Sequence, residues 1–542
     1  MTETLIENGQ YNIGHICTGL QCARGLAGRT ALRWLPSHGP KRDYTFGDLD
    51  LESGRFANVL ASLGLVSGDI FFTFLPKMPE QFIAVLGALK ARVVCGTLFT
   101  NFGEEALLDR LADSGAKAIL TRRVFLPKLA RIRARLPALK YVLAVDGGAA
   151  EGALDLAALM AAAPAEFKVP VTPRNTPSLL HYTSGSTGRP KGVLHCHGSV
   201  EGQAATAREI LGLKPDDIYW CTADQGWVTG TSYGIIGPWS LGVTQVHYGG
   251  GYSAPRWAEI LAAEKITVWY SAPTAFRMLM REDPVLFSDI KTSPLRHIFS
   301  VGEPLNPEVI AWARRAMGRD IHDTWFQTET GAIMISNRPG LEIRPGSMGK
   351  PVPDVTAAVL GKDGRELPPG THGSLCLRPG WPGMFTAYLN NEAAYKDKFV
   401  NGWYHTSDTA RKDADGYFWF DGRSDDVINT AGHLISPFEV ESALLELPEV
   451  AESGVIGAPD ELLFEKVVAF VHLHQGFTPS PELELKLRLH VSNKASTIAT
   501  PQAIVFCEGL PKNKSGKIMR RVLKARYTGA AAGDLSTMEE EA

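Results

Sequence analysis

Cysteine is scarce in this chain, and long apolar runs are missing from it. The seven cysteines are scattered through 542 residues without the paired spacing of a metal site, which favours a reducing compartment and mostly buried thiols. No apolar stretch reaches the roughly 18 residues that a membrane-spanning helix needs, and no basic start precedes an apolar core. We therefore expect a cytoplasmic protein with no membrane partner.

A large charge of either sign is also missing. The formal net charge is −3 at pH 7, so the overall charge does not favour nucleic acid or an anionic membrane as a partner. Hydrophobic residues make up 44% and charged residues 21% of the chain, as in ordinary globular proteins. At this length one hydrophobic core does not suffice, and the chain should fold as two or more domains.

Helical and strand-like segments alternate through the first part of the chain. Thr45 can cap a helix that ends near residue 63, and a buried strand over residues 69–75 precedes a helix over 79–91. Such alternation predicts an α/β fold in which helices cover both faces of parallel or mixed sheets. From residue 349 to about 420, short strands and Gly/Pro turns predict a smaller β-rich subdomain.

A polar, turn-forming run over residues 421–426 marks a domain boundary. Beyond it, the pattern helix, strand, strand, helix, strand, helix predicts a small α+β unit, with Ser436 capping its first helix. We therefore divide the chain into a large N-terminal domain, residues 1–424, and a small C-terminal domain, residues 425–542. A basic loop with one glycine, residues 511–517, precedes the last helix of the small domain.

The stretch from His181 to His195, HYTSGSTGRPKGVLH, contains a run that is too polar and too flexible for the interior of a helix or strand. Glycine accepts the backbone angles that turn successive N–H groups toward one anion, and Arg189 and Lys191 add positive charge. We interpret the run as a loop that binds a polyphosphate, although it is not a Walker A loop. A Ser/Gly linker is the alternative, but apolar segments flank the run on both sides.

Five polar, glycine-bearing segments stand out: residues 183–192, 301–304, 323–331, 405–423 and 511–517. In order and spacing they resemble the signature motifs of the AMP-forming acyl- and aryl-CoA synthetase superfamily, over about residues 30–527. Within that superfamily, Gly226-Trp-Val-Thr-Gly230 and the tryptophan-bearing segment 323–331 are most similar to the short-chain acetyl-CoA synthetases.

The resemblance implies a two-step reaction. A carboxylate attacks the α-phosphate of Mg-ATP to give an acyl adenylate and diphosphate, and the thiol of CoA then displaces AMP. We therefore expect an acid–thiol ligase that uses ATP, CoA and Mg²⁺ and takes acetate or another short-chain acid, in either direction. Both steps build negative charge around phosphorus or the carbonyl group, so hydrogen-bond donors and cations should dominate the site.

Residues that match the superfamily's ATP- and AMP-binding motifs fall into three groups. Those of the phosphate loop are Thr183, Ser184, Gly185, Ser186, Thr187, Gly188 and Lys191. Those expected around the adenine and the α-phosphate are Gly302, Glu303, Pro304, Asp323, Thr324, Trp325, Phe326, Gln327 and Thr328. Asp408 matches the aspartate that accepts hydrogen bonds from the ribose hydroxyls, and Arg423 matches a second ribose and phosphate contact.

The resemblance also implies the catalytic residues. Lys517 matches the lysine that offsets charge at the α-phosphate, Thr328 the threonine that contacts it, and Glu329 the glutamate associated with Mg²⁺, an ion that a hard carboxylate suits. Asp425 matches the hinge about which the small domain swings between the two steps. The basic cluster around Lys517 could instead bind nucleic acid, but it lacks interleaved aromatic residues.

The resemblance places four residues around the acyl group: Val228, Thr229, Val301 and Phe326. The acetate enzymes usually carry tryptophan where this chain has Phe326, so the pocket should admit one or two extra carbons. A methylene group is worth about 0.8 kcal/mol of transfer free energy, and such pockets discriminate by only ~10–200-fold per methylene. We expect acetate as the substrate, with propionate or butyrate as the alternatives and long chains excluded.

Several positions depart from the superfamily's pattern: Ser436 stands in place of a glycine, Ser492 in place of an arginine that contacts CoA, and Leu434 and Ala431 depart as well. Leu434 stands where an arginine commonly contacts phosphates, and leucine offers no such donors. Ala431, where acetyl-CoA synthetases often have serine, and Gly432 are the expected CoA contacts. Three interpretations stay open: an active enzyme with altered affinity for ATP or diphosphate, an inactive protein that binds acyl-AMP or CoA, and a stand-alone adenylation domain that loads a carrier protein. The intact phosphate loop and Lys517 favour the first.

The loop of residues 511–517 also resembles the one in which related enzymes are switched off by acylation of the catalytic lysine. Acylation of Lys517 would remove the charge that the first step needs. A lysine acyltransferase and a deacylase are therefore candidate partners, beside the small molecules: a short-chain carboxylate, ATP or AMP, CoA and diphosphate.

Overall fold

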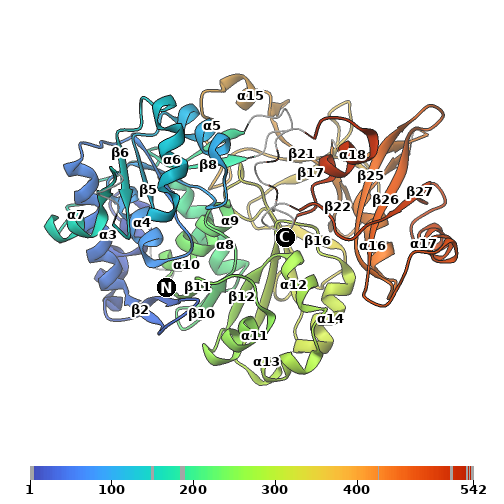
Figure 1. Cartoon of the computed structure of the whole chain (residues 1–542), viewed down its shortest axis with the longest axis horizontal. Coiled ribbons are helices and arrows are strands. Elements are labelled where there is room, and N and C mark those ends of the chain that lie inside the picture. The colour runs from blue at the N-terminus through green and yellow to red at the C-terminus, as the bar shows by residue number, and fades with distance from the viewer. Residues whose placement is uncertain are drawn as a thin grey trace.

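The chain forms a large part that contains the N-terminus and a smaller C-terminal part that lies beside it (Figure 1). The computed structural model describes residues 5–147, 152–183, 190–424, 426–431, 433–512, 517–532, 535 and 538, with the side chain of Leu434 left out. Within these residues three sheets, each containing parallel and antiparallel pairs, are flanked by helices. The α/β fold predicted from the sequence is confirmed.

One sheet of the large part has the strand order β19-β9-β8-β4-β3-β5-β6-β7. Its strands are β3 (Ile70–Phe74), β4 (Val94–Thr97), β5 (Ala118–Thr121), β6 (Tyr141–Ala144), β7 (Leu154–Asp155), β8 (Pro177–Thr183), β9 (Lys191–Cys196) and β19 (Ala387–Tyr388). The strands from β8 through β4 and β3 to β6 run parallel, whereas β8 and β9 pair antiparallel, with Thr183 opposite Lys191. The glycine-rich run therefore connects the ends of two paired strands.

A second sheet extends through the rest of the large part, in the order β17-β18-β21-β22-β16-β15-β14-β13-β12-β10-β11-β1-β2. Its strands are β1 (Thr30–Leu35), β2 (Arg42–Thr45), β10 (Ile218–Cys221), β11 (Thr244–Tyr248), β12 (Val268–Ser271), β13 (His297–Val301), β14 (Ile321–Trp325), β15 (Ile335–Ser336), β16 (Ser347–Pro351), β17 (Ala357–Leu360), β18 (Gly373–Leu377), β20 (Phe399–Val400), β21 (Trp403–Lys412) and β22 (Phe418–Arg423). The β-rich segment has its own apolar core, yet β15 and β16 join it by hydrogen bonds to the parallel strands.

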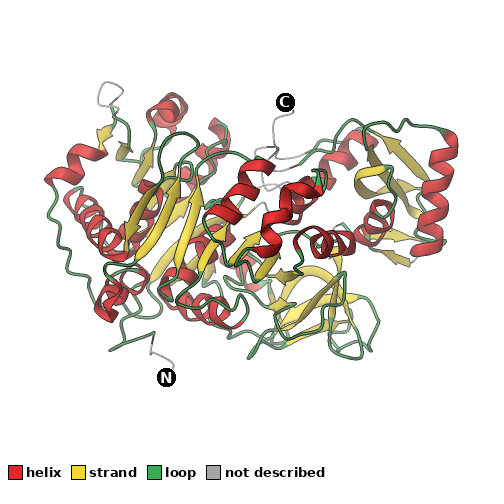
Figure 2. Cartoon of the chain, turned by 90° about the horizontal axis from the view of Figure 1, so that it is seen from below, coloured by secondary structure: helices red, strands yellow, loops and turns green. Residues whose placement is uncertain are grey.

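Helices cover the faces of these sheets (Figure 2). They are α1 (Ile13–Cys17), α2 (Gly19–Gln21), α3 (Phe46–Ser62), α4 (Pro79–Lys90), α5 (Glu104–Ser114), α6 (Leu126–Ile132), α7 (Leu156–Ala162), α8 (Val200–Glu209), α9 (Val228–Thr231), α10 (Gly237–Ser240), α11 (Ala254–Ala263), α12 (Pro273–Leu279), α13 (Ser288–Thr292), α14 (Pro307–Met317) and α15 (Glu392–Lys396). The predicted cap is confirmed: Thr45 and Asp48 form a reciprocal capping box at the start of α3.

The C-terminal part contains the predicted helices and strands and one addition, a short hairpin of β23 and β24. Its elements are β23 (Ile428–Thr430), β24 (His433–Ile435), α16 (Pro437–Leu445), β25 (Val450–Asp460), β26 (Phe464–Leu473), α17 (Pro481–Lys494), β27 (Ala503–Phe506) and α18 (Arg520–Thr528). The strands form a sheet in which β26 is central, pairing with β23, β25 and β27. Ser436 caps α16 as predicted, because its Oγ accepts the N–H of Glu439 at 3.3 Å.

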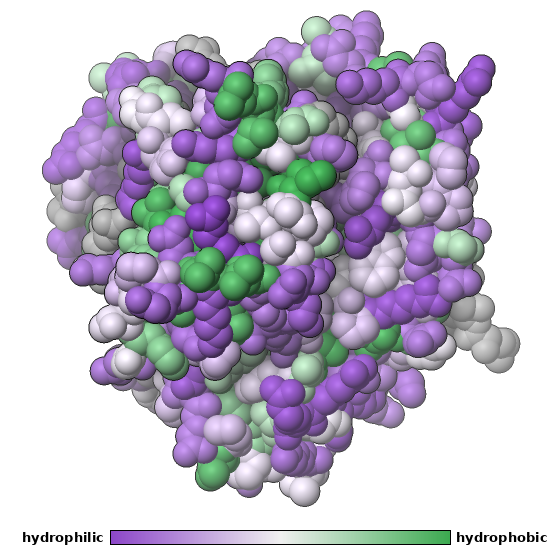
Figure 3. Space-filling view, turned by 90° about the vertical axis from the view of Figure 1, so that its right-hand side faces the viewer, coloured by the Kyte–Doolittle hydropathy of each residue, from purple (hydrophilic) through white to green (hydrophobic). Residues whose placement is uncertain are grey.

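All seven cysteines are free, and five of them are buried, as expected from their scatter. In the part of the chain that the structure describes, no helix combines the length and the apolar character needed to cross a membrane. The face of the C-terminal part seen in Figure 3 is mainly hydrophilic, with hydrophobic side chains in several small groups.

Gly349 in β16 holds the junction between the parallel and the antiparallel strands. Its φ is +93°, and an added Cβ would lie 2.2 Å from the carbonyl of Ser336. We therefore expect Gly349→Ala to destabilise the protein by more than about 2 kcal/mol, through backbone strain and overlap with main-chain atoms. Thermal unfolding followed by circular dichroism measures this loss.

The matched control is Gly251→Ala, where φ is not positive and an added Cβ meets nothing within 4 Å. This substitution should leave the melting temperature unchanged. Equal melting temperatures of the two variants would contradict the expectation.

Candidate active site

A pocket of about 180 Å³ lies at the carboxyl ends of β13 and β14, where β21, β22 and the C-terminal part approach them. It brings together predicted residues from distant parts of the sequence: Gly302, Glu303, Pro304, Asp323, Thr324, Trp325, Phe326, Gln327, Asp408, Arg423 and Lys517. Arg520 of α18 also lines the pocket. Adjacent parallel strands end at the same edge of a sheet, which explains why segments 302–304 and 323–327 meet here.

Asp408 on β21 supplies a buried carboxylate to this pocket. Its Oδ2 accepts hydrogen bonds from Trp325 Nε1 at 3.1 Å and Gln327 Nε2 at 2.9 Å. Arg423 lies opposite Asp408 in the paired strand β22, and its Nη1 is 3.5 Å from Oδ1. Burial raises the pKa of the Asp408 carboxyl, while the charges of Arg423 and Lys517 act to lower it.

Gln327 is fixed by Tyr404, a side chain outside the predicted segments, and by a main-chain carbonyl of β21. Its Oε1 accepts the hydroxyl proton of Tyr404 at 3.0 Å, and its Nε2 also donates to the carbonyl of Thr406 at 2.9 Å. Together with the bond to Asp408, these contacts fix the orientation of the Gln327 side-chain amide, because its nitrogen must face two acceptors and its oxygen a donor. Tyr404 is fully buried, and from the sequence alone such a tyrosine cannot be distinguished from an ordinary core residue.

Asp323 and Thr324 form the wall of the pocket on β14, and both are buried. Burial raises the pKa of Asp323 well above its ordinary value, against the opposing effect of its bond from the Thr324 N–H at 3.0 Å. Thr324 Oγ1 donates to the carbonyl of Ser300 on the neighbouring strand at 2.7 Å. The end of β14 is thereby tied to β13.

Thr328 and Glu329 follow β14 and are held from the other sheet. His195 on β9 places Nε2 2.8 Å from the carbonyl of Thr328, and Tyr388 on β19 donates to Glu329 Oε1 at 2.7 Å. Lys191 lies over the same tyrosine ring, 5.5 Å from its centroid. The phosphate-loop strands and the predicted metal ligand therefore meet at Tyr388. His195 is fully buried, and burial lowers its pKa.

Lys398 is a cation of this region that the sequence analysis missed. Its Nζ donates to Ser407 Oγ at 2.7 Å, next to Asp408. Burial lowers the pKa of Lys398, and its charged neighbours include Glu329 and Lys191. The lysine lies between aromatic residues that pack in the core, outside the matched motifs, so the sequence contained no signal for it.

Three of the four predicted acyl-pocket residues are buried and Phe326 is partly buried, and two of the four share one apolar cluster. Val301 and Phe326 pack in a cluster that also contains Tyr233, whose ring meets that of Phe326 edge-on at 5.5 Å. Val228 and Thr229 begin α9, which continues directly into the turn that carries Tyr233. Tyr233 was not predicted.

Other predicted residues lie away from the pocket or outside the described residues. Ala431 occupies an exposed turn between β23 and β24, where its N–H donates to the carbonyl of Leu463 at 2.8 Å, and it does not line the pocket. The predicted site residues that fall outside the described residues are Ser184, Gly185, Ser186, Thr187, Gly188, Asp425 and Gly432. Thr183 and Lys191, which bound the phosphate loop, lie at the ends of β8 and β9 and face each other in the antiparallel pair.

Comparison with known families identifies the class. Residues 21–389 match the model of the AMP-binding enzyme family, and residues 439–517 match that of the AMP-binding enzyme C-terminal domain. The chain therefore belongs to the AMP-binding enzyme family, and the superfamily resemblance found in the sequence is confirmed.

Individual relatives are named for one particular activity within this family. The chain is 47% identical over 507 residues to the acetyl-coenzyme A synthetase of Bacillus subtilis (strain 168), covering 92% of this chain and 88% of that protein. It is 37% identical over 564 residues to the acetyl-coenzyme A synthetase of Methanothrix soehngenii, covering 98% and 84%.

Solved structures resemble the whole fold. The anthranilate CoA ligase AuaEII in complex with anthranoyl-AMP superposes with a TM-score of 0.87 at 29% identity, covering 97% of this chain and 98% of that one. The Brucella canis acyl-CoA synthetase superposes with a TM-score of 0.74 at 36% identity, covering 96% and 94%. The expected large and small parts are both included in these superpositions.

The bonds around Gln327 generate a prediction. Gln327→Met removes the amide that orients Asp408, so we expect AMP to bind roughly tenfold more weakly, as the loss of a hydrogen bond to a charged group implies. Isothermal titration calorimetry with AMP measures the change. Gln475→Met, at an exposed position, is the matched control, and equal affinities of the two variants would refute the role of Gln327.

Proposed function

We propose that this protein is an AMP-forming acetyl-CoA synthetase, which converts acetate, ATP and CoA into acetyl-CoA, AMP and diphosphate through acetyl adenylate. One observation carries the proposal: Lys517 of the C-terminal part lines the same pocket as Trp325, Asp408 and Arg423 of the large part. The similarity to the Bacillus subtilis enzyme over nearly the whole chain supports acetate as the acid.

The nucleoside of ATP occupies the pocket between segments 302–304 and 323–327. Two donors already satisfy Oδ2 of Asp408, and Oδ1 faces Arg423 at the pocket. This carboxylate is suited to accept hydrogen bonds from the ribose hydroxyls, because a buried anion needs donors on every lone pair. The charge of Arg423 then lies within reach of the ribose and the phosphates.

The phosphates lie against the loop of residues 183–188, with Lys191, Thr328 and Glu329 around them. The residues present fit a magnesium ion. Mg²⁺ characteristically binds through one or two carboxylates together with substrate phosphates and water, and Glu329 offers one such carboxylate. Glu329, oriented by Tyr388, would hold the ion, which neutralises phosphate charge when bound.

In the first step a carboxylate oxygen of acetate attacks the α-phosphorus and diphosphate leaves. Lys517, opposite Asp408 and Arg423, offsets the charge that builds on the α-phosphate. In the second step the CoA thiolate attacks the carbonyl carbon of acetyl adenylate, and AMP leaves with the bonding electrons. Ala431 and Gly432 would contact CoA after the C-terminal part, residues 425–542, turns about a hinge at Asp425, which lies outside the described residues.

The role of Lys517 predicts a split between the two steps. We expect Lys517→Met to lower acetate-dependent exchange between ATP and diphosphate by roughly 10²–10³-fold, as the loss of one transition-state donor does. Transfer of the acetyl group from added acetyl adenylate to CoA should continue. Lys524→Met removes a half-exposed lysine of α18 that pairs with Glu465 of β26. It is the control and should leave both steps unchanged.

Equal loss of both steps in Lys517→Met would contradict this assignment. Turnover by the wild type also excludes an inactive binding protein, and transfer to free CoA without a carrier protein excludes a stand-alone adenylation domain.

The size of Phe326 favours propionate as a second substrate. We expect kcat/KM for acetate and propionate to differ by no more than ~200-fold, and Phe326→Trp to shift the preference toward acetate by ~10–200-fold, the usual value of one methylene. Initial rates with acetate, propionate and butyrate measure this. If palmitate or benzoate is used faster than all three, the four-residue pocket is wrong.

Two further expectations belong to this proposal. The seven free cysteines support a reducing, cytoplasmic location. Lys517 is also the residue on which a lysine acyltransferase and deacylase would act, since acylation would abolish its charge.

A further inference from the structure

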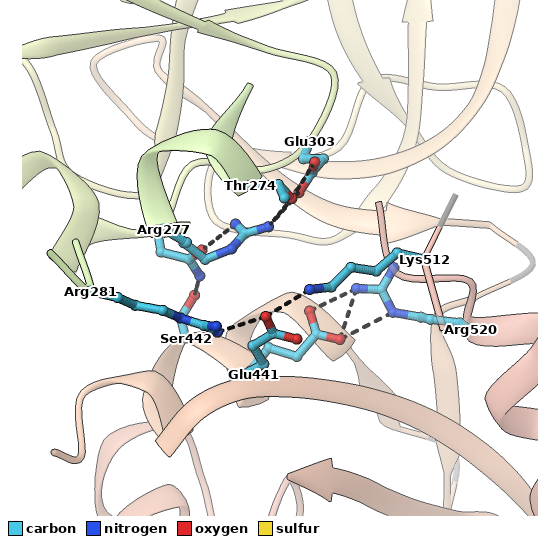
Figure 4. A network of polar contacts seen from close by, with 10 residues as sticks. Thr274, Arg277, Arg281, Glu303, Glu441, Ser442, Lys512 and Arg520 are labelled. Atoms are coloured by element: carbon cyan, nitrogen blue, oxygen red, sulfur yellow. Dashed lines mark hydrogen bonds and ion pairs between the residues drawn. The ribbon is translucent and has the colours of Figure 1, made fainter. Parts of the chain in front are cut away.

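A network of charged and polar side chains joins the two parts of the molecule beside the nucleotide pocket (Figure 4). From the large part it contains residues of α12, Arg281 just after that helix, and residues of the loop after β13. From the C-terminal part it contains residues of α16, β25 and α18 and the start of the 511–517 loop. Residues of the network line a cavity of about 50 Å³, and Lys517 also lines it.

Glu452 on β25 is the junction of this network. Its Oε1 accepts one hydrogen bond from Arg281 Nη2 at 2.7 Å and another from Lys512 Nζ at 2.7 Å. Arg281 belongs to the large part and Lys512 to the C-terminal part. The Glu452 side chain is only 12% exposed, so water competes weakly for its carboxylate, and charge-assisted hydrogen bonds there are strong.

Lys512 connects Glu452 to the catalytic loop. Lys512 and Ile518 form an antiparallel bridge, and the N–H of Met519 donates to the carbonyl of Pro511 at 2.8 Å. The chain leaves and re-enters the loop at this bridge, directly beside Lys517. A side chain that holds Lys512 therefore also holds the base from which Lys517 extends into the nucleotide pocket.

Among the other polar contacts of this network, one crosses the boundary between neutral groups, and two ion pairs each lie within one part. Asn306 Nδ2 donates to Ser442 Oγ at 2.9 Å, a bond between neutral groups. Arg277 pairs with Glu303 at 2.6 Å, and both belong to the large part. Arg520 pairs with Glu441 at 2.7 Å, and both belong to the C-terminal part. Glu452 combines a charged contact across the boundary with a contact to the loop of Lys517.

We propose that Glu452 is a positioning residue for the first half-reaction, which holds Lys517 at the nucleotide pocket by binding Arg281 across the boundary and Lys512 at the base of the loop. This inference rests on the proposed function, in which Lys517 acts in the first step and the C-terminal part moves before the second. Because the bond to Arg281 exists only while the two parts are together, it favours the arrangement that makes acyl adenylate.

The single variants separate the two bonds. Arg281→Met removes the hydrogen bond across the boundary and keeps the bond between Glu452 and Lys512. Lys512→Met removes the bond to the loop and keeps the bond between Glu452 and Arg281. Glu452→Gln weakens both bonds. The two rates to measure are acid-dependent ATP–diphosphate exchange, with whichever short acid the wild type activates best, and single-turnover transfer from added acyl adenylate to CoA. Each single variant should lower the exchange rate by roughly tenfold or more, as expected for one charged hydrogen bond, and leave the transfer rate unchanged.

A double variant tests whether the residues act through one another. In the Glu452→Gln background, Arg281→Met should cause little further loss of exchange, since the negative charge that Arg281 binds has already been removed. Lys486→Met is the matched control, because it removes an exposed lysine that pairs with Glu449 elsewhere in the C-terminal part, and neither rate should change. Circular dichroism checks folding, and Arg281, whose side chain is 37% exposed, can be replaced with little risk to the fold.

Three results would overturn the proposal: an equal loss of both half-reactions, no loss of exchange, or independent, multiplicative effects of Arg281→Met and Glu452→Gln. Failure of the proposed function is distinguishable from these, because the wild type itself would then show no exchange with any short acid.

Discussion

The need to satisfy one buried carboxylate, that of Asp408, organises the site. An unpaired charge at this depth would be strongly destabilising, and the donors that surround it come from separate elements: Trp325 at the end of β14, Gln327 just beyond it, and Arg423 on the paired strand β22. The positive charge of Lys517 comes from the C-terminal part. Asp408 thus interacts with groups from the parallel strands, from the β-rich strands and from the smaller part of the molecule.

The boundary between the two parts is polar where it approaches the nucleotide pocket. A boundary made of hydrogen bonds and ion pairs can open and re-form, since water replaces each lost contact, whereas a large apolar contact would hold the parts together. The Glu452 carboxylate belongs to this boundary, because it connects Arg281 of the large part to Lys512 at the base of the loop that precedes Lys517.

The phosphate side of the site depends on residues that act through others. His195 and Tyr388 hold Thr328 and Glu329 from the neighbouring sheet, and Lys398 adds a cation beside Ser407. Under the proposed function, the positive charge available to the phosphates comes from several elements, so it would not depend on the hairpin of β23 and β24 alone.

Local sequence determined the local structure and the family. The cap at Thr45, the alternation of helices and strands, and the five glycine-bearing segments depend on neighbouring residues, so they could be predicted without knowing what packs against them. The contacts of Tyr404, Tyr233 and Lys398, the continuity of the parallel and β-rich strands, and the junction at Glu452 could not be predicted in this way. These features join residues that lie far apart in the sequence, and a buried tyrosine or an ion-paired glutamate has the same local pattern whether it serves the core or the site. Only the tertiary structure, by bringing those side chains within hydrogen-bonding distance, decided which role each one has.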